Sequence, residues 1–477
     1  MDGGRILVTG ATDYVGGRLV PELVARGHRV RVLLRTASPS AEERFAGAER
    51  SVGDALDPAS LADALKGVDT VCYLIHSLVL RNARTEATAL RAATGFREAA
   101  VRAGVKRLIY LGRQEDRDSS TSDRPSVLKA LRSAAVPVTA LWTAPIIGSG
   151  SALYEALKGL VRHSPVILVP RWSRHRCRPV AIRDVVQSLV SLIEHPVLSG
   201  GDPAIGGLDV LTQAELLQML AGVLGRRRLL LPSPIQSPAF CAYWASWFTS
   251  VPAPILRTLF AAAAGGETVE SSRELEQLLP APPQGCKEAL VRAMSREEQD
   301  RVATHWSDAY PPAHELAMKL DELPAPPRFR ASDSRTTPKR APALFASVCR
   351  IGGREGWCNT NWMWRMRGAI DRLFLGVGTA RGRRCERTLQ LHDAVDFWRV
   401  ERLEKDARLL LRAEMKLPGK AWLEFRIEPE PAGGGNRLSV IAWFAPHGWA
   451  GWLYWWFFVP FHWLIFNDLV RGIEKRA

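Results

Sequence analysis

The chain of 477 residues is 47% hydrophobic, which is ordinary for a folded protein, and it is long enough for about three domains. Its net charge of +15 is spread without a long lysine and arginine tract, so we expect no nucleic-acid partner, while anionic cofactors and anionic membrane surfaces stay open as partners. The seven cysteines include no Cys-x-x-Cys pair, and the sequence shows no cluster of metal ligands and no signal peptide. We therefore expect a cytoplasmic protein with reduced thiols and no metal.

The chain opens with an apolar strand, a glycine-rich turn and the start of a helix, all within residues 6–17. In a dinucleotide-binding site the first glycine allows the tight turn, and the last lets the helix pack closely on the strand. Gly10 and Gly16 occupy these two places. The pyrophosphate would rest on the backbone N–H groups where the helix begins. The residues predicted to bind the cofactor here are Gly10, Thr12, Asp13, Tyr14, Val15 and Gly16.

The middle position of the turn, where a glycine lets the backbone approach the pyrophosphate, is Asp13. A carboxylate about 5 Å from a phosphate costs on the order of 3 kcal/mol at an effective dielectric constant of about 20. We expect Arg18, Arg35 or Arg113 to offset part of this cost, or Asp13 to turn aside and cap the helix. The sequence therefore predicts weakened rather than lost cofactor binding.

Arg35 directly follows the second apolar run, residues 29–34, which we interpret as a buried parallel strand. An acidic residue near this place binds the ribose 2′-hydroxyl of NAD, whereas an arginine accommodates the 2′-phosphate of NADP. Arg35 therefore favours NADP(H) over NAD(H), and the alternative is a solvated arginine in a loop.

Further strands are expected at residues 70–75, 105–111 and 136–141, separated by segments of helix length. This alternation predicts an α/β fold with a doubly wound parallel sheet, and it places the cofactor at the carboxyl ends of the strands. His76 and Ser77 follow one of these strand ends, where ligands collect.

Several segments of this region resemble the atypical, extended short-chain dehydrogenases/reductases, over roughly the first three hundred residues. They are residues 9–16 (TGATDYVG), 53–57 (GDALD), 73–77 (YLIHS), 179–185 (PVAIRDV) and the late glycine segment 206–212 (GGLDVLT). The resemblance implies that the segment of Asp54 and Ala55 contacts the adenine. It also implies that the segment of Ile75, His76 and Ser77 lines the cofactor ribose.

The catalytic half departs from that family, whose chemistry needs a tyrosine acid, a lysine four residues later and a serine or threonine that orients the carbonyl. The expected helix, residues 126–132, has no tyrosine, and the strand end offers Arg113 beside a glycine instead of the serine. Tyr154 and Lys158 have the spacing but follow the next strand, so a surface helix with a solvated Lys158 is the main alternative. The catalytic candidates are His76, Ser77 and Arg113.

We expect four parts along the chain. The Rossmann domain spans 1–200, a substrate or cap region spans 201–327, a proline-punctuated linker spans 328–344, and a second domain spans 345–477. Residues 240–260 in the cap region are rich in aromatic and small apolar side chains, so we expect them to pack over a hydrophobic pocket.

Residues 408–417, 420–428 and 438–444 alternate apolar and polar side chains, which predicts an antiparallel meander with one solvated face. A hairpin turn is expected at 433–436, and a long helix from about Gly448 to Arg476. The region resembles an uncharacterised domain, fused to atypical members of the same family and related to the START-like helix-grip fold. The resemblance implies an apolar ligand cavity, and it rests on residues 376–378, 381–384, 396–400, 413–419, 421–425 and 460–462.

Residues 449–466 form the most apolar run of the chain, but Pro460, His462 and Asn467 interrupt or bound it. We expect it to be the packed helix of the helix-grip fold rather than a membrane span. The alternative is peripheral contact of this aromatic helix with the inner face of the membrane, helped by the basic residues at 381–384.

The sequence thus predicts an NADP(H)-dependent oxidoreductase that acts on a hydrophobic small molecule. Two alternatives stay open. The first is a non-catalytic NADP(H)-binding sensor or scaffold with a lipid-binding C-terminal domain, which the missing tyrosine and lysine favour. The second is a membrane-associated module that carries a vestigial nucleotide site.

Overall fold

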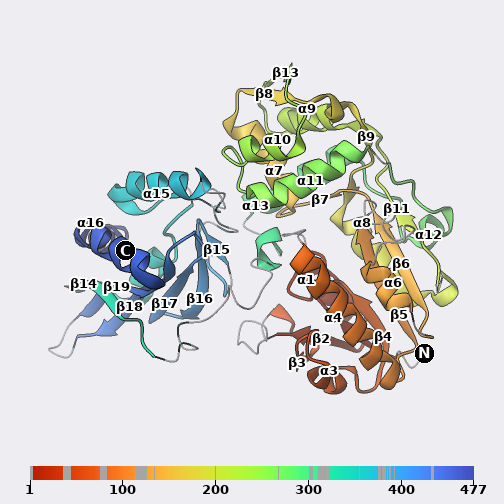
Figure 1. Cartoon of the computed structure of the whole chain (residues 1–477), viewed down its shortest axis with the longest axis horizontal. Coiled ribbons are helices and arrows are strands. Elements are labelled where there is room, and N and C mark those ends of the chain that lie inside the picture. The colour runs from red at the N-terminus through yellow and green to blue at the C-terminus, as the bar shows by residue number, and fades with distance from the viewer. Residues whose placement is uncertain are drawn as a thin grey trace. The chain divides into compact units, whose positions relative to one another are not determined.

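In the computed structural model the chain forms two compact units (Figure 1). Unit 1 comprises Met1–Ala242 with Pro254–Tyr310, and unit 2 comprises Tyr243–Ala253 with Pro311–Ala477. The Rossmann region and most of the expected cap region therefore share one unit. The structure describes residues 4–35, 44–75, 83–113, 126–133, 135–198, 200–266, 268–299, 304–309, 320, 323, 325–353, 355–373, 376, 378, 383, 385, 388–391, 393–430 and 435–477.

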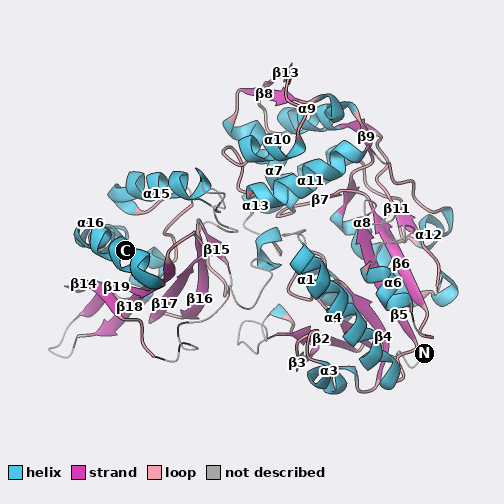
Figure 2. Cartoon of the chain, in the orientation of Figure 1, coloured by secondary structure: helices cyan, strands magenta, loops and turns pink. Residues whose placement is uncertain are grey.

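A seven-stranded sheet organises unit 1, in the order β11-β6-β5-β4-β1-β2-β3, and all of its neighbouring strands are parallel (Figure 2). The predicted doubly wound parallel sheet is therefore confirmed. Every residue of β2 is buried, as expected for a strand that is covered on both faces. The strands are β1 (Arg5–Val8), β2 (Val30–Leu34), β3 (Glu49–Val52), β4 (Val68–Tyr73), β5 (Arg107–Arg113), β6 (Val138–Thr143) and β11 (Ala204–Ile205).

Helices between these strands bury their apolar sides in the main core of unit 1. Helix α1 packs beside α8, and α4 packs beside both α3 and α6. Leu19, Leu23 and Leu189 are among the fully buried side chains that fill this core. The helices are α1 (Gly16–Ala25), α3 (Pro58–Leu65), α4 (Ala83–Arg102), α6 (Val127–Arg132) and α8 (Ile182–Glu194).

A second core in unit 1 joins elements that follow β6. Tyr154 and Leu157 of α7 pack with Leu216 and Leu220 of α9 and with Leu290 of α13. The helices are α7 (Ala152–His163), α9 (Gln213–Val223), α10 (Pro238–Ala245), α11 (Ala253–Gly265), α12 (Arg273–Leu278) and α13 (Cys286–Glu298). The short strands pair as β7 (Ile146–Ile147) with β10 (Val180–Ala181), β8 (Val166–Val169) with β13 (Leu229–Pro232), and β9 (Arg176–Cys177) with β12 (Leu211–Thr212).

Unit 2 contains an antiparallel sheet in the order β14-β19-β18-β17-β16-β15, so the predicted meander is confirmed. The predicted last helix is confirmed as well, and it packs against β14 and β19. The elements are β14 (Phe329–Thr337), α14 (Ala341–Val348), α15 (Asn361–Leu373), β15 (Ala394–Val395), β16 (Trp398–Glu404), β17 (Arg408–Ala413), β18 (Gly419–Pro429), β19 (Asn436–Pro446) and α16 (Gly448–Arg476).

The expected linker at 328–344 is wrong, because this stretch forms β14 and the start of α14. Strand β14 pairs with the full length of β19, from Phe329 opposite Phe444 to Thr337 opposite Asn436. The strand is polar because it lies at the edge of the sheet, where one of its sides stays in water. An edge strand of this kind resembles a linker in composition alone.

The expected solvated face of the meander is wrong in part, because Lys416 and Glu428 are exposed but other charged residues of this face are buried. Glu424 is fully buried and Arg412 is nearly so. The carboxylate of Glu424 accepts a hydrogen bond from Trp443 Nε1 at 2.8 Å, and Arg399 Nε lies 2.6 Å from Glu414 Oε1 in a buried ion pair. Paired and hydrogen-bonded charges can be buried, whereas their alternation in the sequence is the same as that of a solvated face.

The turn between β1 and α1 needs glycine at two places. Gly10 has a φ of +62°, and a Cβ atom there would lie 2.8 Å from the carbonyl oxygen of Leu74. A Cβ atom on Gly16 would lie 2.2 Å from the carbonyl oxygen of Gly10. The backbone of the helix start therefore touches the backbone of the turn, with no room for a side chain.

We predict that Gly16→Ala lowers the free energy of unfolding of unit 1 by about 2 kcal/mol, because the added methyl group forces helix and turn apart. Gly222→Ala is the matched control, since Gly222 also lies in a helix but a Cβ atom there meets nothing within 4 Å. The control should stabilise the protein by up to about 1 kcal/mol. Urea unfolding measures both changes, and equal midpoints for the two variants would contradict the prediction.

Candidate active site

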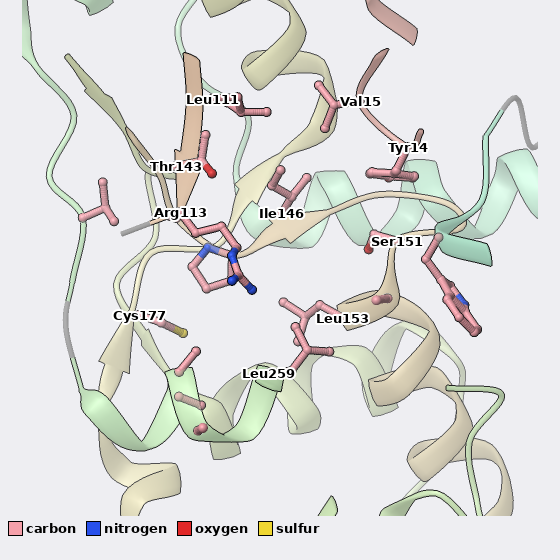
Figure 3. Close-up of a pocket in the computed structure, with 18 of the residues that line it drawn as sticks. Tyr14, Val15, Leu111, Arg113, Thr143, Ile146, Ser151, Leu153, Cys177 and Leu259 are labelled. Carbon is pink, nitrogen blue, oxygen red and sulfur yellow. The ribbon is translucent and has the colours of Figure 1, made fainter. Parts of the chain in front are cut away.

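A pocket of about 330 Å³ lies in unit 1 at the carboxyl ends of the central strands (Figure 3). Its lining runs from the glycine-rich turn, Asp13 to Gly16, to apolar side chains of α7 and α11. Leu111 lines the pocket from β5, while Leu153 and Leu259 come from the two helices. Residues 240–260 were expected to pack over a hydrophobic pocket, but of these only Leu259 is in the lining; the other α11 residues that line the pocket lie after position 260.

The start of α1 carries backbone donors that a pyrophosphate can use. The N–H of Asp13 donates to the carbonyl of Gly10 at 2.9 Å, and the N–H of Gly17 donates to that of Asp13 at 3.0 Å. Among the described residues, no backbone hydrogen bond takes up the N–H groups of Tyr14 and Val15. These donors, with the glycine-walled turn, fit a dinucleotide pyrophosphate.

Asp13 does not cap the helix, because Val15 is the capping residue and no side chain accepts a bond there. Burial raises the pKa of the Asp13 carboxyl to about 7, and the nearby carboxylate of Asp308 adds to the rise. The positive charges of Arg35 and Arg44 act in the opposite direction and lower this pKa. The side chain is thus neutral in a large fraction of molecules near pH 7, which reduces its repulsion of a phosphate.

Residues near position 304 hold the turn from outside, although they lie almost 300 residues away in the chain. Arg18 Nε donates to Thr304 Oγ1 at 2.7 Å, and this hydroxyl donates to the carbonyl of Tyr14 at 2.8 Å. Arg44 Nη2 donates to the carbonyl of Thr12 at 3.2 Å. Sequence reasoning missed Thr304 and Arg44, since no local signal links either residue to the turn.

The other predicted cofactor residues lie at the ends of neighbouring strands, outside the pocket lining. Arg35 is exposed after β2, and Asp54 and Ala55 are half-buried after β3. The carboxylate of Asp54 accepts a bond from the N–H of Leu56 at 2.9 Å and so stabilises its own turn. Ile75, after β4, packs against the main core. These residues lie at the same edge of the sheet because the strands are parallel and their carboxyl ends meet there.

Of the three catalytic candidates, His76 and Ser77 lie outside the described residues. Arg113 ends β5 and lines the pocket. Figure 3 shows its side chain reaching toward the middle of the pocket, across from Leu153 and Leu259. Thr143 lies beside it, and its hydroxyl donates to the carbonyl of Gly112 at 3.3 Å.

Tyr154 and Lys158 have structural roles. Tyr154 is fully buried in the second core, and neither residue lines the pocket. Lys158 is not solvated either, because its Nζ lies 2.7 Å from carboxylate oxygens of both Glu155 and Glu297. Burial raises the pKa of Glu297 to about 7, and the adjacent Glu155 adds to the rise. The spacing expected of a catalytic pair therefore belongs to a buried ion cluster.

Two parts of the chain match known families. Residues 2–129 match the NmrA-like family, and residues 325–469 match a family described as a protein of unknown function, DUF2867. The second match covers the antiparallel sheet and most of α16 in unit 2, and it does not test the START-like interpretation.

A ceramide reductase of Caulobacter vibrioides is 30% identical over 254 residues, which span 51% of this chain and 79% of that protein. Sterol demethylase protein B of Methylococcus capsulatus is 36% identical over 107 residues, which span 22% of this chain and 33% of that protein. A 3-beta-hydroxysteroid dehydrogenase of Mycolicibacterium neoaurum is 34% identical over 115 residues, or 24% of this chain and 30% of that protein. The chain spans about a third of the length of the last two relatives.

Among solved structures, the triphenylmethane reductase of Citrobacter sp. complexed with NADP(H) is similar, with a TM-score of 0.50 and 21% identity. The match covers 61% of this chain and 99% of that protein, and it shows a common fold. Two of the curated relatives are described as a reductase and a dehydrogenase, which agrees with the prediction of an oxidoreductase. Because the ceramide reductase is 30% identical and is aligned over 79% of its length, the chain belongs to the same family as that enzyme.

Proposed function

We propose that this protein is an NADP(H)-dependent oxidoreductase that acts on a hydrophobic small molecule. The observation that carries the proposal is the continuity of one pocket, from the dinucleotide-binding turn at Asp13–Gly16 to the apolar walls of α7 and α11. A cofactor held at the turn and an apolar substrate held by the helices would meet in that space.

The turn between β1 and α1, together with Arg35 after β2, would hold the cofactor. The N–H groups of Tyr14 and Val15 would donate to the pyrophosphate, and Arg35, exposed after β2, would pair with the 2′-phosphate of NADP(H). When bound, NADP(H) supplies or accepts a hydride. Arg44 and Arg35 already lower the pKa of Asp13, so both lie close enough to reduce the negative potential at the turn.

The substrate is proposed to be apolar because aliphatic side chains dominate the far wall of the pocket. Ile146, Leu153 and Leu259 offer no hydrogen bonds, so a polar substrate would lose its hydration there without compensation. The names of the relatives agree with this view, since those proteins are described as a ceramide reductase and a steroid dehydrogenase.

Arg113 is the side chain that we place on the substrate. A guanidinium holds its positive charge at neutral pH and offers several fixed N–H donors, so it can bind a carbonyl oxygen and stabilise negative charge that develops there. It does not release a proton at this pH, so the proton would come from water or from His76 or Ser77, whose roles stay predictions.

The second candidate is a non-catalytic NADP(H)-binding sensor or scaffold. One observation favours it: Tyr154 and Lys158 belong to a buried ion cluster, and α6 carries Lys129 without a tyrosine among its described residues. For unit 2 we retain the START-like helix-grip fold as a proposal, supported by α16 lying against an antiparallel sheet.

Oxidation of NADPH by a panel of ketones and enones of increasing chain length tests the proposal. We expect kcat/KM to rise about fourfold for each methylene until the pocket is full, because each methylene leaves water. NADH serves as the cofactor control. Saturable NADPH binding without turnover of any compound would favour the sensor, and no binding of either nucleotide would contradict both functions.

Replacement of the turn carboxylate tests its effect on the cofactor. Asp13→Asn keeps the shape and removes the charge, so we expect the Kd for NADPH to fall about tenfold at a pH of about 8 and little at about 6. The carboxyl, with its raised pKa of about 7, is mostly protonated at the lower pH. Wild-type affinity should therefore weaken as the pH rises through neutrality. Asp63→Asn, on the exposed side of α3, is the control. Parallel pH profiles for Asp13→Asn and wild type would refute the effect.

Substitution of Arg113 separates binding from chemistry. Arg113→Ala should lower kcat about a hundredfold, because the donor to the carbonyl oxygen is lost, and Arg113→Lys should restore part of it. The Kd for NADPH should stay within about threefold of wild type by fluorescence titration. Tyr154→Phe is the matched control, and its activity should stay within about twofold. A hundredfold loss in Tyr154→Phe would instead support a catalytic tyrosine and lysine.

A further inference from the structure

Helix α16 presents a broad row of large apolar side chains to solvent. We call this row the aromatic face. Trp449 is 80% exposed and Trp463 is 73% exposed, values that are rare for tryptophan in a folded protein. The face comprises Trp449, Trp452, Leu453, Trp456, Phe457, Phe461, Trp463 and Leu464.

The packing of unit 2 does not need this face. The opposite side of α16 packs inward, where Trp455 stacks on Phe444 and Phe329 with ring centroids 5.8 and 5.3 Å apart. Phe466, Leu469, Val470 and Ile473 continue the buried side toward the end of the helix. Members of the aromatic face recur every three or four residues, so they form one stripe along the helix.

The aromatic face bears no charge, and cations flank it. Residues 448–467 contain no Asp, Glu, Lys or Arg. The exposed guanidinium of Arg328 lies 4.6 Å from the ring centroid of Trp452. This arrangement resembles the interfacial belts in which tryptophan lies at the level of lipid headgroups and basic residues meet anionic phosphates.

Helix α15 also exposes an aromatic side chain and a basic side chain. Thr360, directly before α15, donates from its hydroxyl to Asp468 of α16 at 2.9 Å and so ties the start of α15 to α16. Trp362 is 62% exposed and Arg365 beside it is exposed, whereas the acidic Asp371 of this helix is buried. The charge that α15 shows to solvent through its described side chains is therefore basic.

We propose that the aromatic face of α16 docks unit 2 on the surface of an anionic lipid bilayer. The helix lies in the interfacial plane, because no helix in the described part of the chain combines the length and apolar character needed to span a membrane. Trp449, Phe457 and Trp463 enter the headgroup region, and Arg328 and Arg365 pair with lipid phosphates. The inference is independent of the proposed reaction.

The test is co-sedimentation of the full chain with vesicles of phosphatidylcholine that contain about 30% phosphatidylglycerol. We expect binding that weakens on pure phosphatidylcholine vesicles and in about 0.5 M salt, since screening removes the basic contribution. The triple variant Trp449→Ser, Phe457→Ser, Trp463→Ser should lower the partition coefficient at least tenfold, because the buried aromatic area is lost. The double variant Arg328→Gln, Arg365→Gln should reduce only the preference for the anionic vesicles.

The matched control replaces three exposed leucines of unit 1, Leu168→Ser, Leu208→Ser and Leu229→Ser. This control should bind vesicles as the wild type does. If the triple variant does not fold, quenching of wild-type tryptophan fluorescence by brominated phosphatidylglycerol tests whether the exposed tryptophans enter the bilayer. We expect quenching. The proposal is overturned if the wild type does not bind the vesicles or if the control loses as much binding as the triple variant. It is also overturned if light scattering shows that the aromatic face mediates only self-association.

Discussion

The close approach of two backbones, where α1 begins against the turn after β1, is the constraint on which the cofactor site depends. Gly16 leaves no space for a Cβ atom beside the carbonyl oxygen of Gly10. This contact directs the first N–H groups of the helix to one side and places them beside the carboxyl ends of the parallel strands. The sheet order then brings Arg35, Asp54 and Arg113 to the same edge, at the carboxyl ends of their strands.

Local patterns predicted the parallel sheet, the antiparallel meander and the last helix, because these depend on periodicity and on glycines with a steric reason. The patterns failed where burial is decided by partners far away in the chain. Arg412, Glu414 and Glu424 alternate with apolar residues as on a wet face, yet ion pairs and an indole N–H allow them to be buried. Strand β14 looked like a linker, since an edge strand needs few apolar residues.

The candidate site was likewise predictable where it depends on local patterns, and not where it depends on distant contacts. The turn and Arg113 were found because strand ends in a parallel sheet collect ligands. Thr304 and Arg44 were not, since their contacts with the turn join segments that no short motif spans. Tyr154 and Lys158 illustrate the same error, because the main expectation for them was a surface helix with a solvated Lys158. Their spacing satisfied a catalytic pattern, while Glu155 and Glu297 neutralise the lysine in a packed core.

The hydrogen bonds of Thr304 have a further consequence for the rigidity of the turn. The residue links the carbonyl of Tyr14 to the guanidinium of Arg18, so a segment almost 300 residues away in the chain is fastened to the turn. Two hydrogen bonds of this kind hold the backbone of the turn in one conformation, so less conformational entropy would be lost when a ligand binds there.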